Sequence, residues 1–186
     1  MATFDCDQFV ADCISTLKDA DPVPGLTEVV ERAVAAPSEI VSRFPLPLDP
    51  EDDGILYRSA DLLVSTAIFP RGFTTGIHNH TVEAVIGVWT GVEDNFLYER
   101  APSGITALQP KRIETGQVLV LERDAIHDVH VPTSTWSGAL HVYLGDIFEA
   151  SRSEWADAAG EESVFDGANL ERRWAAAAGQ TGLLAS

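Results

Sequence analysis

The N-terminal part of the chain has apolar residues three or four positions apart, which is the periodicity of one face of an α-helix. This spacing predicts helices over residues 4–19, 26–36 and 39–43, and Pro22 and Pro24 are expected to end the first of them. Polar residues occupy the remaining positions, so each helix has one face to bury. We therefore expect two or three N-terminal helices that pack as structural elements on the outside of a larger core.

From residue 56 onward the pattern changes to short apolar stretches, rich in β-branched residues, with turn residues between them. Short strands at regular spacing predict a β-sandwich or barrel. The candidate strands cover residues 56–59, 62–69, 74–80, 84–89, 95–100, 106–113, 118–121, 127–131 and 140–144. After Gly145 we expect the chain to leave the barrel, to turn near Trp155 and to end in a short helix over residues 170–178.

The length of 186 residues suits one domain with a sizeable core, and the hydrophobic content of 45% excludes a disordered chain. The Pro- and Asp-rich connection at residues 44–54 is too short, and too apolar at its start, to link two domains. We predict a single domain over residues 1–186. Its parts are N-terminal helices in 1–45, a β-barrel in 55–147 and a C-terminal extension in 148–186.

The charge is strongly acidic, with 12 basic and 29 acidic residues and a net charge of −17. Nucleic acids and anionic membrane surfaces attract lysine and arginine, so this balance argues against both as partners. Its simplest consequence is solubility. A functional arginine would be conspicuous on such a chain.

The cysteines and the N-terminus bear on the compartment. Cys6 and Cys13 lie on one face of the first predicted helix and form no Cys-x-x-Cys motif, so we expect buried, reduced thiols. No basic segment followed by an apolar one begins the chain, and no apolar run approaches the ~20 residues of a membrane helix. These features predict a cytoplasmic protein.

Histidines supply the most specific chemistry of the sequence. His78 and His80 are separated by one residue, and on a strand such positions point to the same face. A third histidine, His127, comes about 50 residues later, after the Gly-led strand at 118–121. Neutral imidazole is the commonest metal ligand, and three such ligands leave coordination positions open for catalysis. The alternative is that these are polar residues on a solvent-facing strand.

The segments HNHTVEAVIGVWTGVE, DAIHDVHVP and SGALHVY resemble the cupin superfamily. Within it the chain resembles the cysteine dioxygenase-like thiol dioxygenases, especially the bacterial 3-mercaptopropionate dioxygenase branch. The segment LGDIFEASRSEWADAAGEESVFD also resembles that branch, and the resemblance covers roughly residues 57–166. It implies an all-β core in the form of a cupin jelly-roll barrel, flanked by the N-terminal helices and the short C-terminal helix.

The resemblance implies Fe(II) held by His78, His80 and His127. His127 matches the family position better than His130, which is odd-spaced from it and would face the other way on a regular strand. Imidazole sites also take Ni, Co, Cu and Zn, so the residues alone do not fix the metal.

Two further residues match the family's Ser-x-His-x-Tyr motif. His141 and Tyr143 are two apart on one strand face, and the resemblance implies a hydrogen-bonded tyrosine hydroxyl near the metal. Ala139 stands where the serine is expected, so the hydrogen-bond chain is shorter. Residues 83–89 hold no cysteine, so the cysteine–tyrosine crosslink of the animal enzymes cannot form. The alternative for Tyr143 is a core aromatic.

Arg58 and Glu83 are the candidate substrate-binding residues. Arg58 sits where the cysteine dioxygenases place a carboxylate-binding arginine, and a guanidinium matches a carboxylate with two parallel hydrogen bonds. Glu83 lies one residue from the position at which many cupins place a fourth ligand, and a one-residue shift reverses a strand side chain. It could instead line the pocket or face solvent. The alternative arginines for the clamp are Arg71, Arg100, Arg123 and Arg152.

The function implied by the resemblance is the oxidation of a small thiol, 3-mercaptopropionate or cysteine, by O2 to its sulfinate. One alternative is a diverged, metal-dependent cupin oxygenase that acts on another small carboxylate or thiol in a biosynthetic pathway. Another is a non-catalytic cupin that binds a metal or a small molecule. The expected partners are the thiol and O2, with no nucleic acid and no membrane, and the protein would be a monomer or a homodimer.

Overall fold

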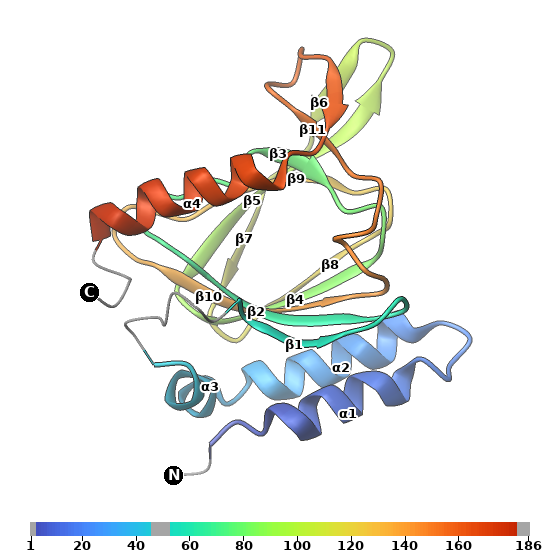
Figure 1. Cartoon of the computed structure of the whole chain (residues 1–186), viewed down its shortest axis with the longest axis vertical. Helices are drawn as coiled ribbons and strands as arrows, with labels where there is room; N and C mark the ends of the chain where they lie inside the picture. The colour runs from blue at the N-terminus through green and yellow to red at the C-terminus, as the bar shows by residue number, and fades with distance from the viewer. Residues whose placement is uncertain (1–2, 46–52, 182–186) are drawn as a thin grey trace.

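The barrel is built from two antiparallel sheets that face each other (Figure 1). The computed structural model describes residues 3–45 and 53–181. One sheet has the order β1-β2-β10-β4-β8, and its strands are β1 (Ile55–Arg58), β2 (Leu63–Phe69), β4 (Ala84–Thr90), β8 (Val118–Leu121) and β10 (Ser137–Tyr143). The other has the order β12-β11-β3-β9-β5-β6, with β7 also paired to β5, and its strands are β3 (Ile77–Asn79), β5 (Val92–Ala101), β6 (Gly104–Ala107), β7 (Lys111–Glu114), β9 (Ile126–His130), β11 (Ser153–Trp155) and β12 (Glu162–Val164).

Strands that are distant in the sequence lie next to each other in both sheets. β2 is paired with β10 and β3 with β9, which is the arrangement of a double-sheet jelly roll. The predicted fold class, an all-β jelly-roll core with N-terminal helices and a C-terminal helix, is therefore confirmed. Part of the predicted connection at 44–54 lies outside the described residues, at 46–52.

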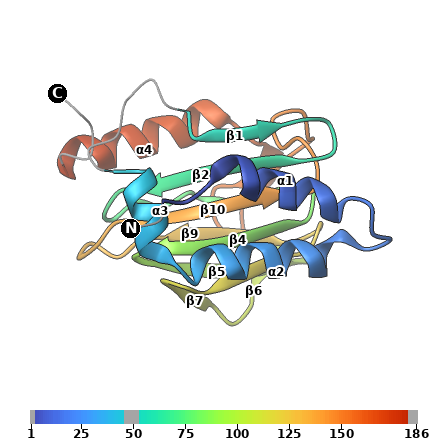
Figure 2. The same cartoon turned by 90° about the horizontal axis from the view of Figure 1, so that it is seen from below.

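The N-terminal helices cover the outer face of the sheet that contains β2, β4 and β10 (Figure 2). They are α1 (Cys6–Thr16), α2 (Pro22–Val34) and α3 (Pro37–Arg43), and α4 (Gly167–Thr181) lies on the other side of the barrel (Figure 1). Pro22 begins α2, so the expectation that it ends the first helix is wrong. A proline at the first helical position needs no N–H partner, and the side chain of Asp21 caps this turn by accepting from the Val23 N–H. Among the described residues, no helix is long and apolar enough to cross a membrane.

Two predictions for the later strands are corrected. The strand expected at 106–113 is divided into β6 and β7, which both pair with β5. The chain after Gly145 does not leave the barrel, because β11 pairs with β3 and places Glu154 opposite His78. β11 and β12 have three residues each, which is too little alternation for the sequence pattern to predict them. The C-terminal extension therefore returns to the strand that carries the histidines.

Alternation along the strands separates two cores. On β10, Leu140 and Val142 face the helices and pack in the cluster that includes Leu26 and Val30. Ala139 and Tyr143 face the barrel interior and pack in a second cluster with side chains of β2, β4 and β8. The interior face of β10 also carries Ser137 and His141, both buried. The barrel interior thus combines apolar walls with buried polar groups.

Gly87 of β4 allows α2 to lie close to the sheet. A Cβ at this position would lie 2.4 Å from Cγ1 of Val30 and 2.8 Å from Cγ1 of Val34. We expect Gly87→Ala to lower the free energy of unfolding by about 1–3 kcal/mol, because these branched side chains leave no room for a methyl group. Urea unfolding measures the change, and Gly179→Ala, where nothing lies within 4 Å of the added Cβ, is the matched control. An unchanged midpoint for Gly87→Ala would contradict this account of the packing.

Candidate metal centre

Three buried histidines converge in the barrel interior. His78 and His127 are directly opposite each other on the paired strands β3 and β9, so their side chains share a face. His80 follows β3, and its Nε2 atom lies 3.2 Å from Nε2 of His78 and 3.3 Å from Nε2 of His127. All three residues are at most 5% exposed. They form a group that could hold a metal ion.

In two of the three rings, hydrogen bonds fix which nitrogen faces the centre. Nδ1 of His78 lies 2.8 Å from the Gly76 carbonyl oxygen, and Nδ1 of His127 lies 3.2 Å from Oδ1 of Asn95. These oxygens only accept, so each Nδ1 carries the proton and each Nε2 presents a lone pair to the centre. A neutral His80 carries one ring proton, so it can donate to Nε2 of His78 or to Nε2 of His127 but not to both in good geometry. A cation shared by the three rings satisfies all of them.

The spacing of the nitrogens fits a metal ion. Metal–nitrogen bonds of about 2.0–2.1 Å, in tetrahedral or octahedral geometry, place neighbouring ligand nitrogens roughly 2.8–3.4 Å apart. The two Nε2 separations at His80 fall within this range. The donor set therefore fits a divalent transition metal that accepts imidazole.

Burial keeps the three rings neutral. Burial, together with the positive charge of Arg152, lowers the pKa of His78 to about 4. The pKa values of His80 and His127 lie well below the ordinary histidine value, first because of burial and then because of the neighbouring histidines. A metal binds the neutral form of imidazole, so no proton has to leave these rings at neutral pH.

The structure places the predicted pair of His141 and Tyr143 beside this cluster. The Tyr143 hydroxyl lies 2.8 Å from Nδ1 of His141, and its ring is perpendicular to that of His80 with centroids 5.1 Å apart. Burial raises the pKa of Tyr143 to about 12, so the phenol stays protonated. Ala139 provides no hydrogen-bonding group, and Nε2 of His141 has no partner among the described residues.

The proton positions of this pair follow from that missing partner. Burial lowers the pKa of His141 to about 4, so the ring is neutral and carries one proton. A buried N–H without an acceptor is less common than an acceptor without a donor. The His141 proton therefore belongs on Nδ1, where it is donated to the Tyr143 oxygen. The hydroxyl proton of Tyr143 is then free for another acceptor.

Glu83 and Arg58 do not reach the histidines. The Glu83 carboxylate pairs with Arg123 at 2.9 and 3.2 Å. Ala84 points into the barrel, so the residue before it points outward, away from the interior face that carries the histidines. Arg58 pairs with Asp146 at 2.8 Å and with the exposed carboxylate of Glu149 at 3.5 Å. Both side chains are thus engaged in ion pairs away from the candidate centre.

Arg152 is the arginine whose charge acts on the centre. Its Nε donates to the carbonyl of Asn79, between the two histidines of the His-x-His segment, at 3.0 Å. Its guanidinium carbon lies 3.8 Å from the centroid of the Phe165 ring, which in turn packs against His78. Within residues 3–45 and 53–181 it has no carboxylate partner. Sequence patterns gave it no priority over the other arginines, because it lies beyond the predicted barrel.

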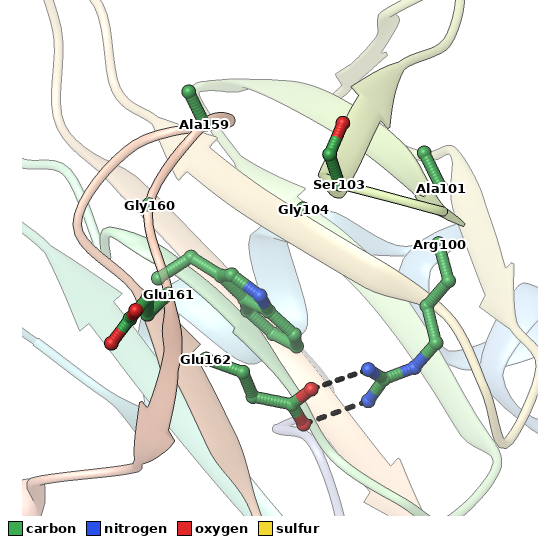
Figure 3. Close-up of a pocket in the computed structure, with 9 residues that line it drawn as sticks. Arg100, Ala101, Ser103, Gly104, Ala159, Gly160, Glu161 and Glu162 are labelled. Atoms are coloured by element: carbon green, nitrogen blue, oxygen red, sulfur yellow. Dashed lines mark hydrogen bonds and ion pairs between the residues drawn. The ribbon is translucent and has the colours of Figure 1, made fainter.

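A separate hollow of about 420 Å³ lies on the outside of the sheet that contains β3 and β9 (Figure 3). Trp155 lines it and packs with Ile77 and Ile126, which alternate along their strands with His78 and His127. The hollow is therefore on the opposite face of the sheet from the histidines. Its arginine, Arg100, is already paired with Glu162 in two parallel contacts (Figure 3).

No family model matches the chain, and no curated protein matches it significantly. Solved structures match in part. The DMSP lyase DddQ from Ruegeria pomeroyi DSS-3 is 23% identical over 55% of this chain and 47% of that one, with a TM-score of 0.42. The cupin domain of Schizosaccharomyces pombe Cnp3 is 9% identical over 51% of this chain and 61% of that one, with a TM-score of 0.42. A variant of the oxalate decarboxylase of Bacillus subtilis is 11% identical over 47% of this chain and 22% of that one, with a TM-score of 0.40.

In each of these pairs the match spans less than two thirds of the other protein's length. The similarity is confined to about half of this chain. It assigns neither a family nor an activity.

Proposed function

We propose that this protein is a metal-dependent cupin-type dioxygenase that oxidises a small thiol, 3-mercaptopropionate or cysteine, with O2 to its sulfinate. The observation that supports it best is the convergence of three buried Nε2 atoms beside an arginine that lacks a carboxylate partner in the described part of the chain. Fe(II) held by His78, His80 and His127 would supply the redox chemistry and favour the thiolate form of the substrate. Ni, Co, Cu and Zn are the alternative metals.

Arg152 is the proposed anchor for the substrate carboxylate, in place of Arg58. Its Nε is used by the Asn79 carbonyl, which leaves the terminal N–H groups for a second acceptor. The ring of Phe165 lies against the guanidinium and restricts its plane. A planar fork of donors held in this way suits a carboxylate. Both candidate thiols carry a carboxylate only a few bonds from sulfur, and in this proposal one molecule contacts the metal through sulfur and Arg152 through its carboxylate.

Tyr143 is the proposed hydrogen-bond donor to the reacting molecule. His141 accounts for one lone pair of the hydroxyl oxygen and leaves the hydroxyl proton available. Because burial keeps the phenol protonated, this donor persists through neutral and mildly alkaline pH. The apolar walls contributed by β2, β4 and β8 exclude water and strengthen the hydrogen bond.

We expect Tyr143→Phe to lower kcat by about 10- to 100-fold with little change in KM, because the lost donor acts during the reaction. Steady-state O2 uptake over a range of thiol concentrations separates the two constants. Tyr57→Phe is the matched control, since it removes a phenol hydroxyl on the helix side of the sheet. An unchanged kcat for Tyr143→Phe would remove this residue from the proposed mechanism.

The decisive experiment is O2 uptake by the Fe(II)-loaded protein. The purified chain is loaded without oxygen and then given 3-mercaptopropionate, cysteine, cysteamine or no thiol. Uptake with a product that is heavier by two oxygen atoms establishes the proposed activity, and cysteamine, which has no carboxylate, should be the poorest thiol. Stoichiometric iron with no uptake would overturn it. A different mass change would identify another metal-dependent reaction on a small thiol.

A further inference from the structure

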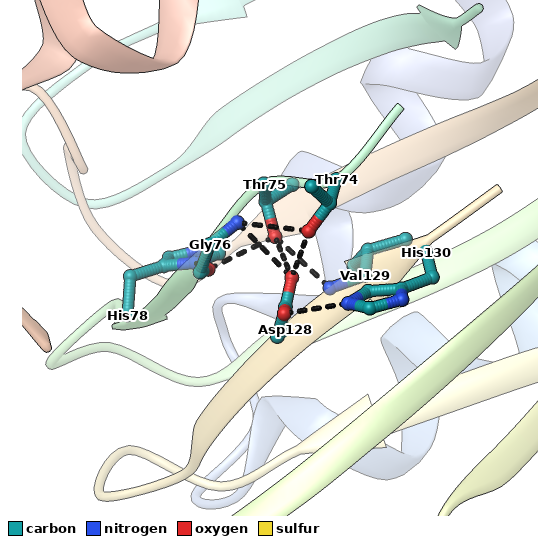
Figure 4. A network of polar contacts seen from close by, with 7 residues as sticks. All are labelled: Thr74, Thr75, Gly76, His78, Asp128, Val129 and His130. Carbon is teal, nitrogen blue, oxygen red and sulfur yellow. Dashed lines mark hydrogen bonds and ion pairs between the residues drawn. The ribbon is translucent and has the colours of Figure 1, made fainter. Parts of the chain in front are cut away.

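Asp128 connects β9 to the segment that precedes β3 by a compact network of hydrogen bonds (Figure 4). It follows His127 on β9, so its side chain points to the other face of the strand, where the residue is only 7% exposed. Oδ1 accepts from the Thr74 hydroxyl at 2.7 Å, the Thr75 hydroxyl at 3.2 Å and the Gly76 N–H at 3.0 Å. Oδ2 accepts from Nε2 of His130 at 2.7 Å.

The segment 74–76 that Asp128 holds leads directly into the first histidine. Gly76 has a φ of 78°, a conformation that glycine adopts readily, and its carbonyl accepts from Nδ1 of His78. Thr75 adds a second connection to β9, since its hydroxyl accepts from the Val129 N–H at 2.9 Å. The position of the Gly76 carbonyl, and with it the ring of His78, therefore depends on the contacts of this segment with β9.

We propose that Asp128 is a positioning residue of the metal centre: it fixes segment 74–76 so that the Gly76 carbonyl sets the orientation and tautomer of His78. The inference rests on the proposed function to the extent that the three histidines bind a metal. A carboxylate oxygen is a stronger acceptor than a neutral one. Here Oδ1 accepts from the Thr74 hydroxyl and the Gly76 N–H, and it shares the Thr75 hydroxyl with the Gly76 carbonyl. Without it the Gly76 N–H retains only a longer contact, 3.3 Å from the Thr74 hydroxyl.

The test uses Co²⁺ as the probe metal on the full chain, with absorption spectra to report coordination. We expect Asp128→Ala to bind Co²⁺ about 10- to 100-fold more weakly than the wild type, with an altered visible spectrum, as is typical when a group that orients a ligand is removed. Asp128→Asn should restore most of the affinity, because its amide oxygen can still accept from Thr74 and Gly76.

A second measurement separates positioning from general loss of stability. Val30→Ala removes volume from the helix-facing core, remote from the histidines, and should lower the melting temperature of the metal-free protein without changing Co²⁺ affinity. Asp128→Ala with wild-type Co²⁺ affinity and spectrum would overturn the inference while the proposed function stands. A wild-type protein that binds no Co²⁺ would overturn both. Tight Co²⁺ binding that Asp128→Ala weakens, together with no thiol oxidation, would support the inference and reject the thiol dioxygenase.

Discussion

His80→Ala will abolish stoichiometric metal binding and thiol-dependent O2 uptake. Nε2 of His80 is the atom that lies within 3.2 and 3.3 Å of both other ligand nitrogens, so its removal leaves two ligands and an open side. The loss of affinity should exceed the roughly 10- to 100-fold that follows from changing a group that only orients a ligand. Metal content after Fe(II) loading and Co²⁺ titration measure the effect, and O2 uptake with 3-mercaptopropionate gives the activity.

The control for this variant is His130→Ala, which removes a histidine whose side chain is 47% exposed and outside the cluster. It takes away the partner of Asp128 Oδ2 and leaves the contacts of Oδ1 with segment 74–76. It should retain stoichiometric metal. Circular dichroism of the metal-free His80→Ala protein should show the same β-sheet content, because His80 follows β3 and lies outside the strand pairing. If His80→Ala retained one metal per chain with an unaltered Co²⁺ spectrum, the three-histidine centre would be rejected.

Arg152→Gln will lower kcat/KM for carboxylate-bearing thiols by roughly 30-fold or more. This corresponds to a loss of about 2–5 kcal/mol of transition-state stabilisation, as when one partner of a hydrogen-bonded charge pair in a binding site is removed. The loss should appear mainly in KM, because the carboxylate does not take part in the reaction. Cysteamine has no carboxylate for Arg152 to bind, so its low rate should change little in this variant. Rates with 3-mercaptopropionate, cysteine and cysteamine therefore identify the anchor.

Arg58→Gln is the matched control, since Arg58 already pairs with Asp146 and Glu149. Its kcat/KM should stay near that of the wild type. The opposite pattern, a large loss with Arg58→Gln and none with Arg152→Gln, would return the anchor to the position that the sequence resemblance implies. It would also require these ion pairs to open when substrate binds.

The parts of the centre that could be predicted from sequence are those encoded by local spacing. His78 and His80 share a face because strand side chains alternate, whatever strands lie beside them. His141 and Tyr143 are brought together by the same rule, and their 2.8 Å contact needs no distant partner. The main strands followed from alternation and turn residues. These predictions fail where a strand is very short, as in β11 and β12.

The tertiary structure decided everything that depends on which strands lie side by side. Pairing of β11 with β3 brings the C-terminal extension to the histidines and places Arg152 there, which no local pattern could indicate. The direction of the Glu83 side chain depended on whether Glu83 or Ala84 enters the barrel. That choice is made by the pairing of β4 with β8 and β10. The groups that orient the rings, Gly76 and Asn95, are likewise supplied by a loop and a neighbouring strand. Local spacing thus determined the faces of the ligands, while long-range pairing determined what surrounds them, because hydrogen bonds between strands are not encoded in the spacing of either strand alone.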